Sequence, residues 1–177
     1  LIPLKHQALL LFDIDGVIRD VSSSYRRAIQ ETVLELAGWL PSINEIDNLK
    51  AEGTWNNDWQ ASHELIKRGN PGLTNKFKKI PSIDRVIQVF NNFYFGGHPE
   101  SDPNEWEGFI LNEKLLVKKS YFDDLTINKI GWGFVSGAEL SSAKFILEKR
   151  LGLVCAPLIA MGDAPDKPNP TGFISLS

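Results

Sequence analysis

Hydrophobic residues form two kinds of pattern along the chain. Continuous apolar runs at residues 8–15, 130–137 and 158–163 each end in aspartate, serine or glycine. Such runs are typical of strands buried on both faces of a parallel sheet. Residues 22–97 and 138–151 instead repeat apolar positions at the spacing of a helix. The order strand, helix, strand, helix, strand predicts an α/β protein with a parallel sheet.

The long helical segment interrupts the α/β pattern and predicts a second lobe. Its first apolar positions share one helix face: Tyr25, Ala28, Ile29, Val33 and Leu36. A loop rich in glycine, proline and aspartate, residues 96–108, closes the segment. We therefore expect residues 1–21 and 98–177 to form a discontinuous α/β core and residues 22–97 to form a helical cap.

Polar residues follow each predicted strand. Asp13 and Asp15 close the first strand, Ser136 and Gly137 close the second, and Lys167 lies in the loop after the third. Ligands of parallel α/β sheets bind beyond the carboxyl ends of the strands. The pattern therefore predicts two carboxylates, a hydroxyl and a cation at one edge of one sheet.

Each of these residues also has a structural alternative. The aspartates before Gly16 can simply form a turn, Ser136 can cap the helix predicted at residues 138–151, and Lys167 can be a solvated loop residue. A calcium-binding EF-hand loop is excluded, because the position of its obligatory glycine is occupied by Ile18 and the preceding segment is strand-like.

Composition limits the classes of partner. With 177 residues, 42% hydrophobic residues and a net charge of −3, the chain reads as globular without a basic footprint for nucleic acid. The KFKK run at residues 76–79 is interpreted as a solvated segment, and the apolar runs are too short to span a membrane. Cys155 lies in an apolar stretch and is predicted to be a core residue. Because it is the single cysteine, the chain can form no internal disulfide, which favours a cytoplasmic protein. Three histidines are too scattered for a zinc site: His6, His63 and His98.

Three stretches together resemble the haloacid dehalogenase-like (HAD) superfamily, most of whose members are magnesium-dependent phosphatases. They are "FDIDGVIRD" at residues 12–20, "GFVSGA" at 133–138 and "DKPNPTGF" at 166–173. The resemblance covers nearly the whole chain and implies a Rossmann-like core with a helical cap inserted after the first motif. A further stretch, "GTWNNDWQASHELI" at 53–66, is similar to the cap of a largely cyanobacterial phosphatase-like subgroup.

The resemblance implies a role for each polar residue. Asp13 would be the nucleophile that forms an aspartyl-phosphate, and Asp15 the general acid and then base. Ser136, Gly137 and Lys167 would bind the phosphate group. A magnesium ion would be held by the Asp13 side chain and the Asp15 backbone carbonyl. The expected function is therefore hydrolysis of a small phosphorylated metabolite.

A cluster in the predicted cap is a candidate for substrate binding. Trp55, Asn57, Asp58 and Trp59 combine amphipathic rings with polar groups suited to a polar leaving group. The alternative is that the tryptophans pack the core of the cap and Asp58 caps a helix.

One part of the family pattern is missing. The family carries a fourth motif, an acidic pair after the lysine, whereas the only similar stretch here is "GDAPD" at 162–166, before Lys167. We interpret that stretch as the loop leading to Lys167. We therefore expect a core that is truncated at the C-terminus, with weak magnesium binding and little or no phosphatase activity in this chain. A phosphomutase and a non-catalytic binding protein stay as alternatives, whereas Asp15 argues against a dehalogenase, which needs no proton donor for halide.

Overall fold

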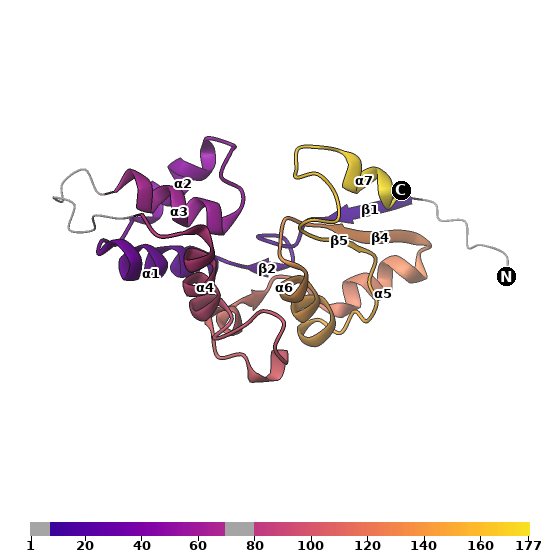
Figure 1. The fold of residues 1–177 in the computed structure, drawn as a ribbon. Coiled ribbons are helices and arrows are strands. Elements are labelled where there is room, and N and C mark those ends of the chain that lie inside the picture. Colours follow the sequence, from indigo (N-terminus) through magenta and orange to yellow (C-terminus); the bar gives the residue numbers. More distant parts are fainter. Residues whose placement is uncertain (1–7, 70–79) are drawn as a thin grey trace. The chain divides into compact units, whose positions relative to one another are not determined.

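The structure is a computed structural model that describes residues 8–69 and 80–177 and divides them into two compact units (Figure 1). The α/β unit comprises the described residues up to Asp20 together with Lys114–Ser177, and the helical unit is Val21–Glu113. The KFKK run and His6 lie outside the described residues.

A parallel sheet forms the centre of the α/β unit, as the sequence predicts. Its strand order is β1 (Ala8–Phe12), β4 (Ile130–Val135), β5 (Leu158–Ile159). In the register, Phe12 lies beside Phe134, and Val135 lies beside Ile159. Consequently the three strands end at the same edge of the sheet.

Helices cover both faces of this sheet (Figure 1). On one face, the Phe122 ring of α5 (Lys119–Ile127) lies 5.6 Å from the ring of Phe12 and 5.5 Å from that of Phe134. On the other face, α7 (Thr171–Ser175) approaches so closely that a Cβ on Gly172 would lie 3.0 Å from Val135 Cγ1. Neighbouring residues of β4 therefore pack against opposite helices, because side chains alternate along a strand.

The remaining elements of this unit differ from the prediction. The segment predicted as one helix begins at α6 (Leu140–Lys144) and continues as a π-helical turn, η3 (Phe145–Arg150). Two short strands that were not predicted, β2 (Arg19–Asp20) and β3 (Lys114–Leu115), pair antiparallel. A strand of two residues carries no periodicity that a sequence pattern could reveal.

Helices make up the second unit, and three of its described α-helices begin at a residue whose side chain caps the backbone. Ser42 and Glu45 form a reciprocal capping box, and the side chains of Asn57 and Ser82 accept backbone N–H bonds at two other helix starts. The helices are α1 (Tyr25–Ala37), α2 (Ile43–Ala51), α3 (Asp58–Arg68) and α4 (Ile83–Tyr94), with short 3-10 turns η1 (Pro103–Glu105) and η2 (Phe109–Asn112). The apolar face predicted for α1 is buried at Ala28, Ile29 and Val33.

The second boundary of the helical unit lies at Glu113, whereas the sequence analysis placed residues 98–113 in the core. This segment is bound to the end of α4, because the N–H groups of Glu107 and Gly108 both donate to the Phe95 carbonyl, at 3.1 and 3.0 Å. A Cβ on Gly108 would lie 2.3 Å from the Tyr94 carbonyl oxygen, so only glycine fits this approach.

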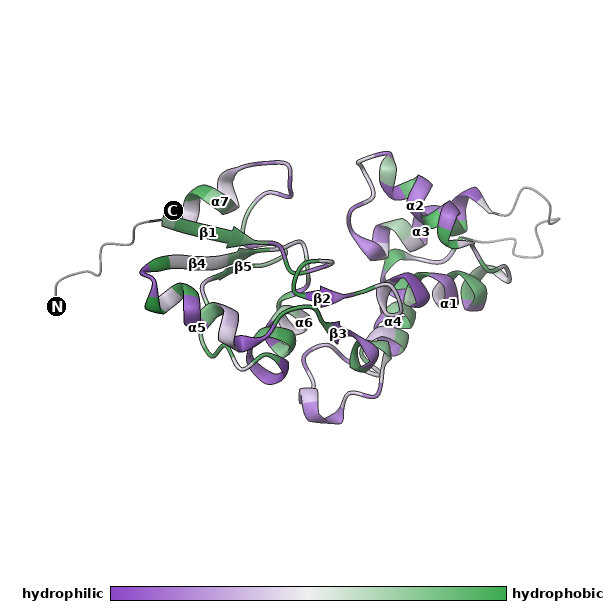
Figure 2. Cartoon of the chain, turned by 180° about the vertical axis from the view of Figure 1, so that it is seen from behind, coloured by the Kyte–Doolittle hydropathy of each residue, from purple (hydrophilic) through white to green (hydrophobic). Residues whose placement is uncertain are grey.

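The hydropathy of the residues agrees with their burial except in β1 and at Cys155. Figure 2 shows β1 hydrophobic along its length and β2 hydrophilic. Leu9 and Leu10 of β1 are nevertheless exposed. The prediction that Cys155 is a core residue is wrong, because Cys155 is exposed and lies in a turn, where its φ is 55°. Among the described residues, no helix has both the length and the apolar character needed to cross a membrane.

Candidate active site

The turn after β1 positions the two aspartates. Between them, Ile14 is fully buried, and its carbonyl accepts the N–H groups of Val17, Ile18 and Arg19. This tight turn ends the strand at Phe12, earlier than predicted, and fixes the backbone on which Asp13 and Asp15 stand. Their side chains are 41% and 34% exposed, so both carboxylates are accessible to a ligand.

Lys167 connects the ends of two strands. Its Nζ lies 2.8 Å from Asp13 Oδ2 and donates a hydrogen bond to the Val135 carbonyl at 3.4 Å. The other Asp13 oxygen, Oδ1, accepts the Ile14 N–H at 2.8 Å. Asp13 thus presents a carboxylate at the end of β1 that is held by a cation and a backbone donor.

Ser136 and Gly137 follow β4 directly. Ser136 is buried, and its Oγ accepts the Ala138 N–H at 3.1 Å. The cap of α6 is instead Glu139, whose side chain accepts the Ser142 N–H, so the capping role considered for Ser136 is wrong. Gly137 is exposed, and a Cβ there would meet no atom within 4 Å.

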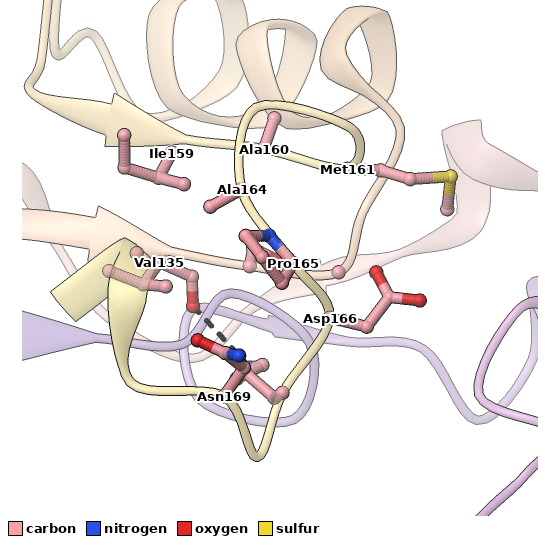
Figure 3. A pocket seen from close by; sticks show the side chains of 12 residues that line it. Val135, Ile159, Ala160, Met161, Ala164, Pro165, Asp166 and Asn169 are labelled. Carbon is pink, nitrogen blue, oxygen red and sulfur yellow. Dashed lines mark hydrogen bonds between the residues drawn. The ribbon is translucent and has the colours of Figure 1, made fainter. Parts of the chain in front are cut away.

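A small pocket lies beside these residues (Figure 3). Ser136, Gly137 and Lys167 line it together with Asp166 and Asn169 from the loop after β5. Its volume is about 20 Å³, room for about one water molecule, whereas metabolite pockets usually measure about 300–1,000 Å³. Within this unit, the pocket can therefore hold part of a phosphoryl group but not a whole metabolite.

Arg19 is a site residue that the sequence analysis missed. It is 1% exposed, its Nε donates to Asp15 Oδ1 at 2.7 Å, and its Nη2 donates to Ser142 Oγ at 2.9 Å. The available signal was an arginine next to the apolar pair Val17 and Ile18 in "DGVIRD". An arginine that is fully buried is almost always paired.

The first aspartate of the acidic stretch before Lys167, Asp163, stabilises a turn. Asp163 Oδ2 accepts the Ala160 N–H at 2.9 Å and so closes the turn after β5. Over residues 8–69 and 80–177, no group of three histidine, cysteine or acidic side chains is placed to hold a metal ion. Oxygen donors suitable for magnesium are the exposed Asp13 carboxylate and the Asp15 backbone carbonyl, which fit an ion that keeps most of its waters.

The four residues proposed for substrate binding all lie in the helical unit and make contacts within it. Asn57 caps α3 by accepting the Trp59 and Gln60 N–H groups, so it fills the capping role considered for Asp58. The other contacts are Asp58 with Lys50 at 2.6 Å, Trp55 Nε1 with Glu52 at 2.8 Å, and Trp59 Nε1 with Asn91 at 3.3 Å. A substrate-binding role for these four residues stays a prediction.

Comparison with known sequences gives one informative match. No model of a known protein family matches the chain. Among curated proteins, an imidazoleglycerol-phosphate dehydratase of Phytophthora nicotianae is 32% identical over 166 residues. The match covers 93% of this chain but 34% of the dehydratase, so the chain spans about a third of the length of this relative.

Solved structures are similar over nearly the whole chain. Phosphatase Tt82 from Thermococcus thioreducens has a TM-score of 0.69 at 22% identity, covering 95% of this chain and 78% of that protein. CbbY from Rhodobacter sphaeroides, solved with xylulose-(1,5)bisphosphate, has a TM-score of 0.64 at 13% identity, covering 97% and 71%. A HAD-superfamily hydrolase of subfamily IA from Geobacter sulfurreducens has a TM-score of 0.51 at 14% identity, covering 95% and 70%. The fold of the chain is therefore that of the haloacid dehalogenase-like (HAD) superfamily.

Proposed function

We propose that the protein is a magnesium-dependent phosphomonoester hydrolase that acts on a small phosphorylated metabolite through an aspartyl-phosphate. The observation that carries the proposal is the 2.8 Å pair between Asp13 Oδ2 and Lys167 Nζ, beside the pocket that Ser136 and Gly137 line. An exposed carboxylate next to a cation suits attack on an anionic phosphate ester, which otherwise repels a nucleophile.

In the first step, an Asp13 oxygen attacks phosphorus and forms an acyl-phosphate bond while the bond to the ester oxygen breaks. Asp15, in its protonated form, donates a proton to the departing oxygen, so the leaving group departs as an alcohol. In the second step, Asp15 accepts a proton from a water molecule that attacks the same phosphorus, which regenerates the Asp13 carboxylate and releases inorganic phosphate.

Three residues would stabilise the phosphoryl group during both steps. Lys167 supplies positive charge, and the Gly137 backbone allows close approach because no side chain fills the space around it. The Ser136 hydroxyl accepts a bond from Ala138 with its oxygen, which leaves its O–H to donate to a phosphoryl oxygen.

Magnesium, when bound, would supply positive charge that polarises the phosphoryl oxygens. The residues that would hold it are Asp13, through its carboxylate, and Asp15, through its backbone carbonyl. With so few protein donors, we expect magnesium to bind weakly until a phosphate group adds further oxygen ligands.

Four residues of the helical unit would bind the leaving group. Trp55 and Trp59 offer apolar faces, and Asn57 and Asp58 offer polar groups at the start of α3. All four side chains are half-buried, so part of each surface remains accessible.

The test is phosphate release from a panel of phosphomonoesters by the purified chain in the presence of magnesium. Asp13→Asn should abolish turnover, because an amide cannot form the acyl-phosphate. Asp123→Asn is the matched control, because Asp123 also pairs with a lysine, Lys119 at 2.6 Å, but lies on α5 and is exposed. Substantial residual turnover by Asp13→Asn would contradict the assignment of the nucleophile.

The panel should include imidazoleglycerol phosphate, because a curated relative is named for action on that compound. Product analysis by ³¹P NMR separates hydrolysis from phosphoryl transfer within a sugar phosphate, since only hydrolysis releases inorganic phosphate. A product that keeps its phosphate would favour a phosphomutase.

A further inference from the structure

We propose that Arg19 is a positioning residue that holds the Asp15 carboxylate in the orientation needed for proton transfer. The inference rests on the function proposed above, because it assigns Arg19 a role through the general acid and base of that reaction. Arg19 itself would touch neither the substrate nor the reacting phosphorus.

The geometry of the guanidinium supports this role. Only 2% of the Arg19 side chain is exposed, and its rigid fork donates to Asp15 Oδ1 at 2.7 Å and to Ser142 Oγ at 2.9 Å. Ser142 belongs to α6, whereas Asp15 belongs to the turn after β1. One buried side chain therefore fastens the turn carrying Asp15 to a helix of the α/β unit.

The backbone of Arg19 is held as firmly as its side chain. Its N–H donates to the Ile14 carbonyl at 3.2 Å, its carbonyl accepts the Gly16 N–H at 2.8 Å, and its register partner in β3 is Leu115. A guanidinium anchored at both ends can orient a carboxylate, because little side-chain freedom remains to be lost.

Electrostatics make this arrangement specific to arginine. A buried cation is costly unless it is paired and hydrogen-bonded, and removal of one partner leaves the other charge unsatisfied. Lysine would keep the charge, but its ammonium cannot reproduce a planar fork that joins two partners.

A purely structural role is the competing explanation, and the dependence on the leaving group separates the two. Alkyl phosphates need protonation of the departing oxygen, whereas p-nitrophenyl phosphate carries a good leaving group and needs it much less. A positioning residue that acts through Asp15 must therefore affect alkyl phosphates more, whereas a loss of folded protein lowers both rates equally.

The experiment compares kcat and KM of the full chain and of Arg19→Met, Arg19→Lys and Ser142→Ala on both substrates. We expect Arg19→Met to lower kcat on the alkyl phosphate by about tenfold or more beyond its effect on p-nitrophenyl phosphate, with KM nearly unchanged. Arg19→Lys should recover part of this loss, and Ser142→Ala should show a smaller loss of the same kind. Lys119→Met, which breaks an exposed ion pair of the same spacing, should change neither rate.

A double variant makes the test specific to Asp15. In an Asp15→Asn background, Arg19→Met should add no further loss on the alkyl phosphate, because the residue through which it acts is already inactive. Equal losses on the two substrates, or full additivity with Asp15→Asn, would overturn the inference while leaving the proposed hydrolase intact.

Crystal structures of the wild-type chain and of Arg19→Lys supply a readout independent of activity. The inference requires the Asp15 carboxylate to change orientation or become disordered in the variant, and an unchanged, ordered carboxylate would refute it. If the wild-type chain hydrolyses no phosphomonoester, the proposed function fails by itself, and the structures still decide whether Arg19 positions Asp15. Ser142→Ala serves both measurements if substitution of Arg19 prevents folding.

Discussion

Two carboxylates at the end of β1 are paired with two different cations. Asp13 lies against Lys167, which is 34% exposed, and Asp15 lies against Arg19, which is almost completely buried. An exposed ammonium on a flexible stem can shift towards an incoming phosphate, whereas a buried guanidinium cannot. The two pairs therefore suit different tasks, one adapting to the ligand and the other fixing a geometry.

Lys167→Met should lower kcat/KM for phosphomonoesters by about 10²–10³-fold, the usual effect of removing one donor that stabilises developing charge. The side chain is partly exposed, so the thermal unfolding midpoint should change little. Steady-state kinetics and circular dichroism check both statements, with the exposed Lys149→Met as the control. Retention of most of the wild-type kcat/KM would mean that Lys167 only supports the loop.

Sequence reasoning predicted that three of these residues lie near one another because of a general property of parallel sheets. Asp13, Ser136 and Lys167 follow three different strands, and parallel strands bring such residues to one edge. Arg19 was missed although it lies only four residues from Asp15, because its burial and its contact with Ser142, 123 residues away, appear only in the folded chain. The small volume of the pocket could not be predicted from the sequence either, because it depends on how the loop after β5 packs.

Among the elements of the helical unit, α2 and α3 are joined by an exposed ion pair. Arg68 at the end of α3 contacts both oxygens of Glu52, at 2.5 and 2.8 Å, and Trp55 Nε1 donates to the same carboxylate. The Arg68 hydrogen bonds, followed by that of Trp55, lower the pKa of Glu52 from 4.5 to about 2.

This shift predicts a pH dependence of stability. A carboxylate whose pKa is lowered in the folded state contributes stability above its unfolded pKa of 4.5 and loses it as the pH falls towards about 2. Glu52→Gln should therefore lower the unfolding midpoint near neutral pH, by less than about 5 °C for an exposed pair. The difference from the wild-type chain should shrink as the pH falls below 4.5 and vanish below a pH of about 2.

Thermal melts of both proteins across this range provide the measurement. High salt should reduce the neutral-pH difference, because the pair is exposed and screened. A difference that persists unchanged at the lowest pH would show that Glu52 stabilises by packing rather than by charge.

Elements were predicted well where periodicity is long and poorly where it is short. The helix face of α1 and the hydrophobic strands β1 and β4 carry patterns over many residues, and the structure has them. Strand ends were predicted two to four residues too far. In the case of β1, the sequence does not reveal that the Ile14 carbonyl begins a turn.

In the molecule as a whole, β1 is an exposed edge. Over the described residues it pairs with β4 and with no second strand, and Leu9 and Leu10 remain 40% and 38% exposed. A flat apolar edge with unpaired backbone groups is a template for pairing between molecules.

Leu9→Lys should therefore reduce self-association of the purified chain. The long lysine stem can cover the apolar surface while its charge stays in water, so the unfolding free energy should change by no more than about 1 kcal/mol. Light scattering as a function of concentration measures the effect, with Val154→Lys, an exposed position outside the strands, as the control. Equal scattering by Leu9→Lys and the wild-type chain would show that β1 does not mediate self-association.

The β2–β3 ladder also determines how the helical unit is attached to the chain. The segment leaves after Asp20 and returns at Lys114, and these two residues are partners in the ladder. Partners in an antiparallel ladder have Cα atoms only about 4.5–5.5 Å apart, the gap that an ordinary hairpin turn bridges. Residues 21–113 are thus inserted at one point of a hairpin, and a short turn in their place would leave the two strands of the ladder within pairing distance.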